Sequence, residues 1–312
     1  GEIKAFIIPA DQHDPLTKEK MIDKLLAQGI DVRRATGPFT HEGRVYDTGT
    51  YVVSTAQPKR GVIRWLLGRT FYPDNSYTRN RDGSPIRPYD MSTDNMAEFM
   101  GVWVDEVNEV VRTDLTRIHT PVQKAGPVAK GTYGYVIDGR LNDSFQAVNM
   151  LLDNKVKLRR IDRSSRDDLR PGDFIVEAGA NATVVKDAAL RTGVSFTALG
   201  TNETSGSHEV VRSRIGMYQR YYGGNMDEGW TRLLLERFGF PYKSIMDDEI
   251  RAGKLNDSYD AVILPADGAD RMTGDQSPGG GNNFGRRPED YPPKYRSGFG
   301  KEGVEALEAF VD

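Results

Sequence analysis

The same order of predicted elements occurs twice in this sequence. Residues 4–67 contain a strand, an amphipathic helix, two strands and a second helix, read from "KAFIIPAD", "LTKEKMIDKLLAQG", "IDVRRA", "TGTYVVSTAQ" and "PKRGVIRWLLG". Residues 133–193 repeat that order, and "LLAQGIDVRRA" aligns with "LLDNKVKLRRI". We infer an internal duplication, which predicts that "FIIPA" and "YVIDG" are central buried strands at equivalent positions of two superimposable units.

A third, looser copy begins at Arg214. We expect "RIGMYQ" to form a strand, "EGWTRLLLERFGF" a helix, and "YKSIMDD" and "SYDAVILPAD" two further strands. Strands that alternate with helices of about 10 to 15 residues favour parallel sheets joined by right-handed crossovers. The expected fold class is therefore α/β, built from repeated strand-helix-strand-strand units with parallel sheets of the flavodoxin-like kind.

Polar, turn-rich segments separate the copies. Residues 72–90 and 119–134 carry Pro and Gly without apolar periodicity, and we interpret them as loop and linker. They place a boundary near residue 125, which gives domains 1–125 and 126–312. Because the first strand begins almost at once and "ALEAFVD" ends within a helical pattern, we expect a segment of a longer protein, truncated at its C-terminus.

The composition narrows the choice of partners. The 312 residues carry a net charge of −3 with acids and bases interspersed, which offers no basic surface for nucleic acid phosphates. The longest apolar runs, such as "AVIL" at 261–264, are far shorter than the roughly 20 residues that span a bilayer. We therefore expect neither nucleic acid nor a membrane as partner. The absence of cysteine excludes disulfides, thiolate zinc sites and cysteine nucleophiles.

The stretch "FIIPADQHDP" runs from a strand into three candidate ligands for a divalent metal, Asp11, His13 and Asp14. The other interpretation is a strand-to-helix turn, in which Asp14 precedes Pro15 and Thr17 caps the following helix. No histidine of the sequence stands in the helical His-x-x-Glu or His-Glu-x-x-His spacing of zinc sites. The turn is therefore the favoured interpretation, and we expect no metal or other cofactor in this segment.

A cleft is predicted where the third copy's strands end, because ligands of open α/β sheets bind at the carboxyl ends of the strands. "MDEGW" starts the helix of this copy, and residues 265–300 form an unusually long connection that we interpret as a mobile lid or an insertion. The candidate cleft residues are Asp227, Glu228, Trp230 and Asp267, with Arg286, Arg287 and Tyr295 closing over them. The alternative is structural: Asn225 or Asp227 caps the helix, and Trp230, Leu233 and Leu234 pack on the sheet.

Several stretches resemble one protein family. "AFIIPADQHDP", "GTYVVSTAQPKRG" and "RPYDMSTDNMAEFMGV" are similar to the segment that follows the catalytic domain of large bacterial zinc carboxypeptidases. "RIGMYQRYYGGNMDEGWTRLLLERFGFPYKSI", "YDAVILPADG" and "YRSGFGKEGVEALEAFV" resemble the C-terminal domain of the same proteins, which is related to the class I glutamine amidotransferase fold. The resemblance covers nearly the whole chain, and "MDEGWTR" and "GKEGVEAL" are its most specific parts.

The resemblance implies a role without chemistry of its own. The zinc of such carboxypeptidases is held by two His and one Glu in the catalytic domain, and those residues are not in this sequence. The cysteine nucleophile of active amidotransferases is also missing. The implied function is a non-catalytic accessory region that acts as scaffold, substrate gate or interaction domain, with the catalytic domain and its peptide substrate as partners. Export to the periplasm or outside is common in that family.

Two other functions stay open at this point. One is a flavodoxin-like module that binds a small anionic ligand and has no link to a peptidase. The other is a hydrolase or amidotransferase acting alone, against which the missing catalytic residues argue. The upstream coding sequence distinguishes the accessory region from the flavodoxin-like module, because a zinc peptidase domain requires a His-x-x-Glu and a further His.

Overall fold

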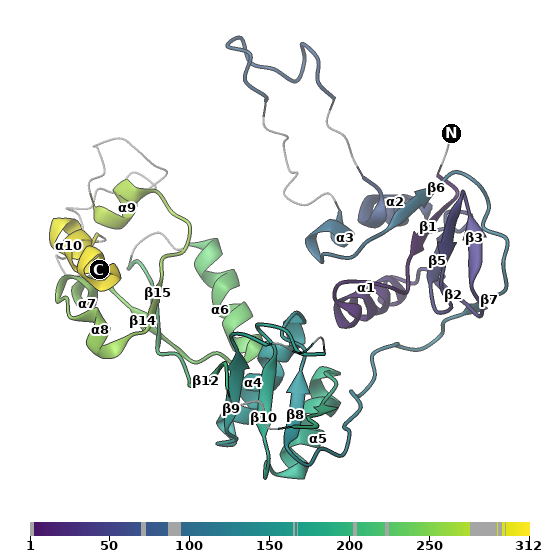
Figure 1. Cartoon of the computed structure of the whole chain (residues 1–312). Coiled ribbons are helices and arrows are strands. Elements are labelled where there is room, and N and C mark those ends of the chain that lie inside the picture. The colour runs from purple at the N-terminus through teal and green to yellow at the C-terminus, as the bar shows by residue number, and fades with distance from the viewer. Residues whose placement is uncertain are drawn as a thin grey trace. The chain divides into compact units, whose positions relative to one another are not determined.

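The computed structural model of the chain describes residues 3–69, 73–86, 95–164, 166, 168–201, 205–221, 225–274, 292, 295–296 and 298–312 (Figure 1). Residue contacts divide the chain into two compact units. The first unit comprises Gly1–Ser144 and Ile161–Asn202, and the second comprises Phe145–Arg160 and Glu203–Asp312.

The first sheet has five strands in the order β6-β1-β5-β2-β7. The strands and helices of this region are β1 (Ala5–Ile8), α1 (Pro15–Ala27), β2 (Arg33–Ala35), β3 (Phe39–His41), β4 (Arg44–Tyr46), β5 (Tyr51–Ser54), α2 (Arg60–Leu67), α3 (Met96–Phe99), β6 (Asp105–Val107) and β7 (Leu115–Arg117). Strands β3 and β4 pair as a separate antiparallel hairpin. All four neighbouring pairs in the five-stranded sheet are antiparallel.

This pairing corrects the expectation of a parallel sheet. Strands β1 and β2 run in the same direction, as a strand-helix-strand crossover predicts, but β5 lies between them and is antiparallel to both. The main strands therefore follow the split βαβ arrangement of ferredoxin-like folds, with α2 leading from β5 to β6 at the far side of β1. Apolar periodicity identifies the strands and helices. It does not show that β5 inserts between β1 and β2.

The two faces of the first sheet carry separate apolar clusters. Phe6 and Ile8 of β1 pack with the apolar residues of α1 and α2, such as Leu25 and Ile63. On the other face Ala5, Ile7 and Val52 pack with Tyr46 of the β3–β4 hairpin and with residues of the β6–β7 connection. Both faces are covered because β1 is apolar at every position and buried throughout.

The second sheet has the same strand order as the first, β11-β8-β10-β9-β12. Its elements are β8 (Gly134–Ile137), α4 (Asn142–Asp153), β9 (Leu158–Ile161), β10 (Phe174–Glu177), α5 (Ala182–Thr192), β11 (Thr197–Ala198) and β12 (Ser207–Glu209). Strand β8 pairs antiparallel with β10 and β11, as β1 does with β5 and β6. Helix α5 begins at the Asn181 cap and ends at Gly193, whose φ of 77° is the left-handed conformation that favours glycine.

The shared strand order confirms the equivalent positions predicted from the repeat. Strand β1, which overlaps "FIIPA", and strand β8, which overlaps "YVIDG", each occupy the second place of a five-stranded sheet. The burial of the two strands differs, because β1 is fully buried whereas Tyr135 and Val136 of β8 are only half-buried. The duplicated order of elements therefore extends to how the strands are arranged.

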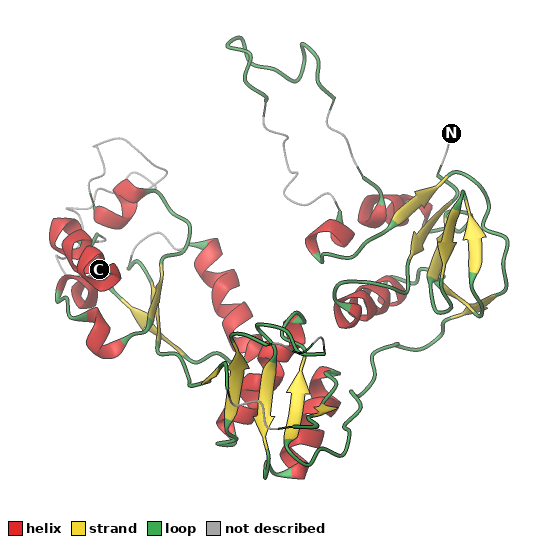
Figure 2. Cartoon of the chain, in the orientation of Figure 1, coloured by secondary structure: helices red, strands yellow, loops and turns green. Residues whose placement is uncertain are grey.

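The third sheet is small and parallel, with the order β14-β13-β15 (Figure 2). The elements of this region are β13 (Ile215–Tyr218), α6 (Met226–Phe238), β14 (Tyr242–Ile245), α7 (Asp247–Arg251), α8 (Leu255–Ser258), β15 (Ala261–Ile263), α9 (Ala269–Thr273) and α10 (Gly300–Val311). The predicted parallel pairing is found here, where β13 pairs parallel with both β14 and β15. The described chain is thus a mixed α/β structure whose sheets are mostly antiparallel.

The turn between β8 and α4 contains a carboxylate that should make stability depend on pH. Arg140 and Arg170 approach Asp138 at 2.8 and 3.0 Å. Partial burial by itself raises the pKa of Asp138, but hydrogen bonds from Arg140 and the charges of Arg170 and Arg140 outweigh it and lower the pKa to about 2. A depressed pKa means that the stabilisation is complete above the unfolded value and is lost as the pH falls through the folded one.

We therefore expect the difference in unfolding free energy between the wild type and Asp138→Asn to shrink as the pH is lowered from about 4 to about 2. Urea unfolding at a series of pH values measures this difference. Added salt should reduce it, since the arginine side chains are partly exposed. A difference that stays constant over this pH range would mean that the Asp138 ion pairs do not stabilise the fold.

Candidate functional site

Polar side chains gather where the parallel strands β13 and β15 end. Gln219 and Arg220 follow β13, and Asp267 stands shortly after β15. Helix α6 starts beside them, because the Oδ1 of its cap Asn225 accepts hydrogen bonds from the amides of Asp227 at 2.8 Å and Glu228 at 3.4 Å. The Asn225 amide nitrogen donates to the carbonyl oxygen of Ala266 at 2.9 Å, which ties the start of α6 to the segment after β15.

Two ion pairs hold this edge of the sheet together. Arg220 Nε lies 2.6 Å from Asp267 Oδ2, and the two side chains are only 8% and 9% exposed. Glu228 pairs with Arg232 one turn further along α6. Arg232 also donates hydrogen bonds to the side chains of Gln219 at 2.9 Å and Ser244 at 2.7 Å. The charges of this cluster are therefore compensated within the second unit.

The space enclosed by the cluster is small. A pocket of about 40 Å³ is lined by Tyr218, Gln219, Arg220, Asn225, Glu228, Pro265 and Asp267. This volume holds about two or three water molecules and no organic substrate. In the described conformation the edge is thus a buried ionic cluster, and a ligand would have to separate Arg220 from Asp267 to enter.

A second buried acid supports the same edge. Asp247, at the start of α7, is 1% exposed and accepts hydrogen bonds from the Tyr218 hydroxyl at 2.6 Å and from the Gly298 amide at 3.0 Å. Burial and the hydrogen bond to the Asp247 carboxylate raise the pKa of Tyr218 far above its usual value. Tyr218 therefore stays protonated and acts as a fixed donor. The Phe299 ring packs edge-on against Tyr218 at 5.3 Å.

The structure brings some of the predicted cleft residues together and separates others. Glu228 and Asp267 line the same small pocket. Tyr295 packs edge-on against Tyr221, just beyond Arg220, with ring centroids 5.5 Å apart. Asp227 is exposed and lines none of the pocket. Arg286, Arg287 and most of the predicted lid lie outside the described residues.

Sequence reasoning missed the partners of these acids. Arg220, Arg232, Tyr218 and Asp247 supply the charges and hydrogen bonds of the cluster. A signal was present in "GMYQR", where an arginine stands two residues after the strand, as Asp267 stands shortly after "AVIL". Opposite charges after neighbouring parallel strands meet at one edge, which predicts the Arg220–Asp267 pair.

The solvent side of α6 is apolar, contrary to the expectation that its large residues pack on the sheet. Met226, Trp230, Leu233 and Leu234 are 83%, 68%, 43% and 57% exposed. Their spacing of four, seven and eight residues puts them on one face of the helix, which we call the α6 apolar face. Leu235, on another side of the helix, is the buried residue of α6. Trp230 is therefore a surface residue and lines none of the pocket described above.

The "DQHDP" turn is built by hydrogen bonds. Asp14, rather than the expected Thr17, caps α1: it accepts from the Thr17 amide at 3.0 Å and the Thr17 hydroxyl at 2.9 Å, and also from the Asn142 amide at 3.1 Å. The Gln12 side chain accepts from the Trp103 amide at 2.8 Å and donates to its carbonyl at 3.0 Å. Lys18 donates to the carbonyl of Ala10 at 2.9 Å, and burial lowers its pKa. These contacts fix the turn.

No group of three or more His, Asp or Glu side chains among the described residues has an arrangement that could hold a metal ion. No helix in the described part of the chain has both the length and the apolar character that a bilayer crossing requires. No family model, no curated protein and no solved structure matches this chain. The class of protein is therefore given by the fold and site alone: a mixed α/β protein with a buried ionic cluster at the edge of a small parallel sheet.

Proposed function

We propose that this chain is the non-catalytic C-terminal accessory region of a zinc-dependent metallocarboxypeptidase, and that its α6 apolar face binds the catalytic domain of the same protein. The resemblance of nearly the whole sequence to the post-catalytic region of such enzymes supports this proposal. In this view the zinc and the peptide substrate belong to the catalytic domain. The part around β13 to α10 would then have the class I glutamine amidotransferase-like architecture without its catalytic cysteine.

The observation that carries the proposal is the exposure of the α6 apolar face. "MDEGWTR", one of the stretches most specific to the resembling family, supplies Met226 and Trp230, which are among its most exposed apolar residues. Core packing does not explain why large apolar side chains stand at these positions. Contiguous exposed apolar surface marks interaction sites, and tryptophan is the residue type most enriched among those that dominate binding energy.

A binding measurement tests this proposal. The catalytic domain encoded upstream is produced separately, and its affinity for this chain is measured by calorimetry. Trp230→Ala should weaken binding at least about tenfold, and Trp230→Ala with Leu234→Ser should weaken it further. Trp65→Ala is the matched control, because Trp65 is also more than half exposed but lies on α2. Equal loss in both tryptophan variants would contradict the assignment of the face.

The upstream coding sequence tests the family assignment independently. A domain with His-x-x-Glu and a further His is expected there, and its absence would end the proposal. The second candidate, a small-ligand-binding module of flavodoxin-like type, is favoured by the polar cluster at the carboxyl ends of β13 and β15. The closed Arg220–Asp267 pair makes it the weaker candidate.

A further inference from the structure

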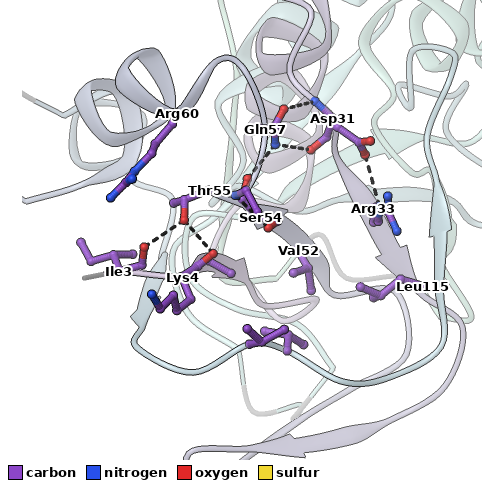
Figure 3. Close-up of a pocket in the computed structure, with 14 residues that line it drawn as sticks. Ile3, Lys4, Asp31, Arg33, Val52, Ser54, Thr55, Gln57, Arg60 and Leu115 are labelled. Atoms are coloured by element: carbon purple, nitrogen blue, oxygen red, sulfur yellow. Dashed lines mark hydrogen bonds and ion pairs between the residues drawn. The ribbon is translucent and has the colours of Figure 1, made fainter. Parts of the chain in front are cut away.

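A pocket of about 420 Å³ lies beside β1 and β5 of the first sheet and reaches Arg60 at the start of α2 (Figure 3). Ala5 and Val52 line it from the sheet, together with Val110 and Val111 of the β6–β7 connection and Leu115 of β7. Half of its fourteen lining residues are aliphatic. Its volume falls within the range of small-molecule sites, roughly 300 to 1,000 Å³.

Positive charge predominates among the lining side chains. Lys4, Arg33 and Arg60 line the pocket against a single acid, Asp31. Asp31 already pairs with Arg33 and with Arg117, each at 3.4 Å. Lys4 is exposed and makes no ion pair with any side chain that the structure describes. In Figure 3 the Lys4 and Arg60 side chains extend towards the same side of the pocket, away from Arg33 and Leu115.

The polar wall between these cations is fixed before any ligand arrives. The Thr55 hydroxyl lies 2.9 Å from the carbonyl oxygens of both Ile3 and Lys4. The Gln57 amide donates to the carbonyls of Asp31 at 3.1 Å and Ser54 at 2.7 Å, while its oxygen accepts from the Asp31 amide at 2.7 Å. In Figure 3 the Gln57 bonds lie near the top of the view and the Thr55 bonds lie lower, beside Ile3 and Lys4. A rigid wall lowers the entropy lost when a ligand is ordered.

We infer that this pocket binds a small organic anion, a carboxylate with an aliphatic body. The carboxylate lies at the Lys4 and Arg60 end, and the aliphatic body lies on Val52 and under Val110 and Val111. The apolar lining favours such a ligand over inorganic phosphate, which would leave that surface in water. This site is distinct from the α6 apolar face, and the inference does not depend on the proposed peptidase function. The same chemistry is found in fatty acids and in the C-terminal residue of a peptide that ends in leucine.

Binding of defined probes to the whole chain tests the inference. Octanoate represents the fatty acid and N-acetyl-leucine represents the peptide end; their neutral amides, octanamide and N-acetyl-leucinamide, are the controls. We expect at least one carboxylate to bind at millimolar concentration or below, and about tenfold more tightly than its amide. Chemical-shift changes should appear at Val52 and Val110. The stronger of the two carboxylates identifies the source of the ligand.

Two substitutions locate the binding. Lys4→Gln should weaken carboxylate binding about tenfold, while Lys24→Gln on the exposed side of α1 should leave it unchanged. Val110→Glu places an acid at the mouth and should abolish binding; Val110 is exposed, so the fold is kept. No binding of either carboxylate, equal binding of acids and amides, or unchanged affinity in both pocket variants would each overturn the inference.

Discussion

Asp267→Ala is expected to lower the free energy of unfolding of the second unit by about 3 kcal/mol or more. The substitution leaves the Arg220 guanidinium, whose side chain is 8% exposed, without the carboxylate that lies 2.6 Å from it. Removing one member of a buried ion pair is strongly destabilising, because the remaining charge keeps its desolvation cost and loses its attraction to that partner. Arg271, at 3.8 Å from the same carboxylate, would lose its partner as well, although its side chain is half exposed.

Native-state hydrogen exchange in urea measures this effect in the second unit, because it follows single amides, whereas tryptophan fluorescence would mix Trp230 with Trp65 and Trp103 of the first unit. Asp270→Ala is the matched control, since Asp270 is an exposed acid three residues away. The double variant Arg220→Met with Asp267→Leu should recover much of the lost stability, because it removes both charges together. A destabilisation by Asp267→Ala no larger than that by Asp270→Ala would show that the pair does not hold the edge of the third sheet.

Asp14→Ala should destabilise the first unit by about 2 to 3 kcal/mol. The loss of a helix cap alone costs about 1 kcal/mol. Asp14 is buried, however, and it also accepts hydrogen bonds from the Thr17 hydroxyl and the Asn142 amide, which the substitution leaves without an acceptor. The expected cost therefore exceeds that of an exposed cap.

Native-state hydrogen exchange of amides in the first unit, measured in urea, reports this loss. Asp11→Ala, a change of an exposed acid in the same turn, should cost less than about 0.5 kcal/mol. Asp14→Asn should retain most of the stability, because asparagine caps helices as well as aspartate does. If Asp11→Ala were the more damaging change, the structural interpretation of "DQHDP" would be wrong.

The sequence predicts the elements of this fold better than their pairing. Apolar runs and helical periodicity identify β1, α1, β5 and α2, and the repeat predicts the matching positions of β1 and β8. These signals are local. Whether "TGTYVVS" adds outside β2 or inserts between β1 and β2 depends on contacts between segments far apart in sequence, and no local pattern records it. The expectation of parallel sheets was wrong for that reason in both five-stranded sheets.

For the candidate site, too, sequence reasoning places some residues and misplaces others. Glu228 and Asp267 could be placed together because the ends of parallel strands meet at one edge. Trp230 was misplaced in both interpretations, since a large aromatic residue at a helix start was expected either to line the cleft or to pack on the sheet. Its exposure follows from its position one turn after Met226, on the same side as Leu233 and Leu234. The sequence shows that this face is apolar but not which way it points.

The matching strand orders of the first and second sheets bear on how this chain reaches its native state. During folding, β1 and β8 each have two places into which they can insert. The second place of either five-stranded sheet lies between two antiparallel neighbours. Exchange of such strands is a characteristic error of chains with repeated domains. One difference between the repeats disfavours such an exchange: Phe6 of β1 is fully buried in an apolar cluster, whereas Tyr135, at the matching position of β8, is half-buried and carries a hydroxyl. Tyr135 in the place of Phe6 would bury that hydroxyl, which costs free energy unless the hydroxyl is hydrogen-bonded.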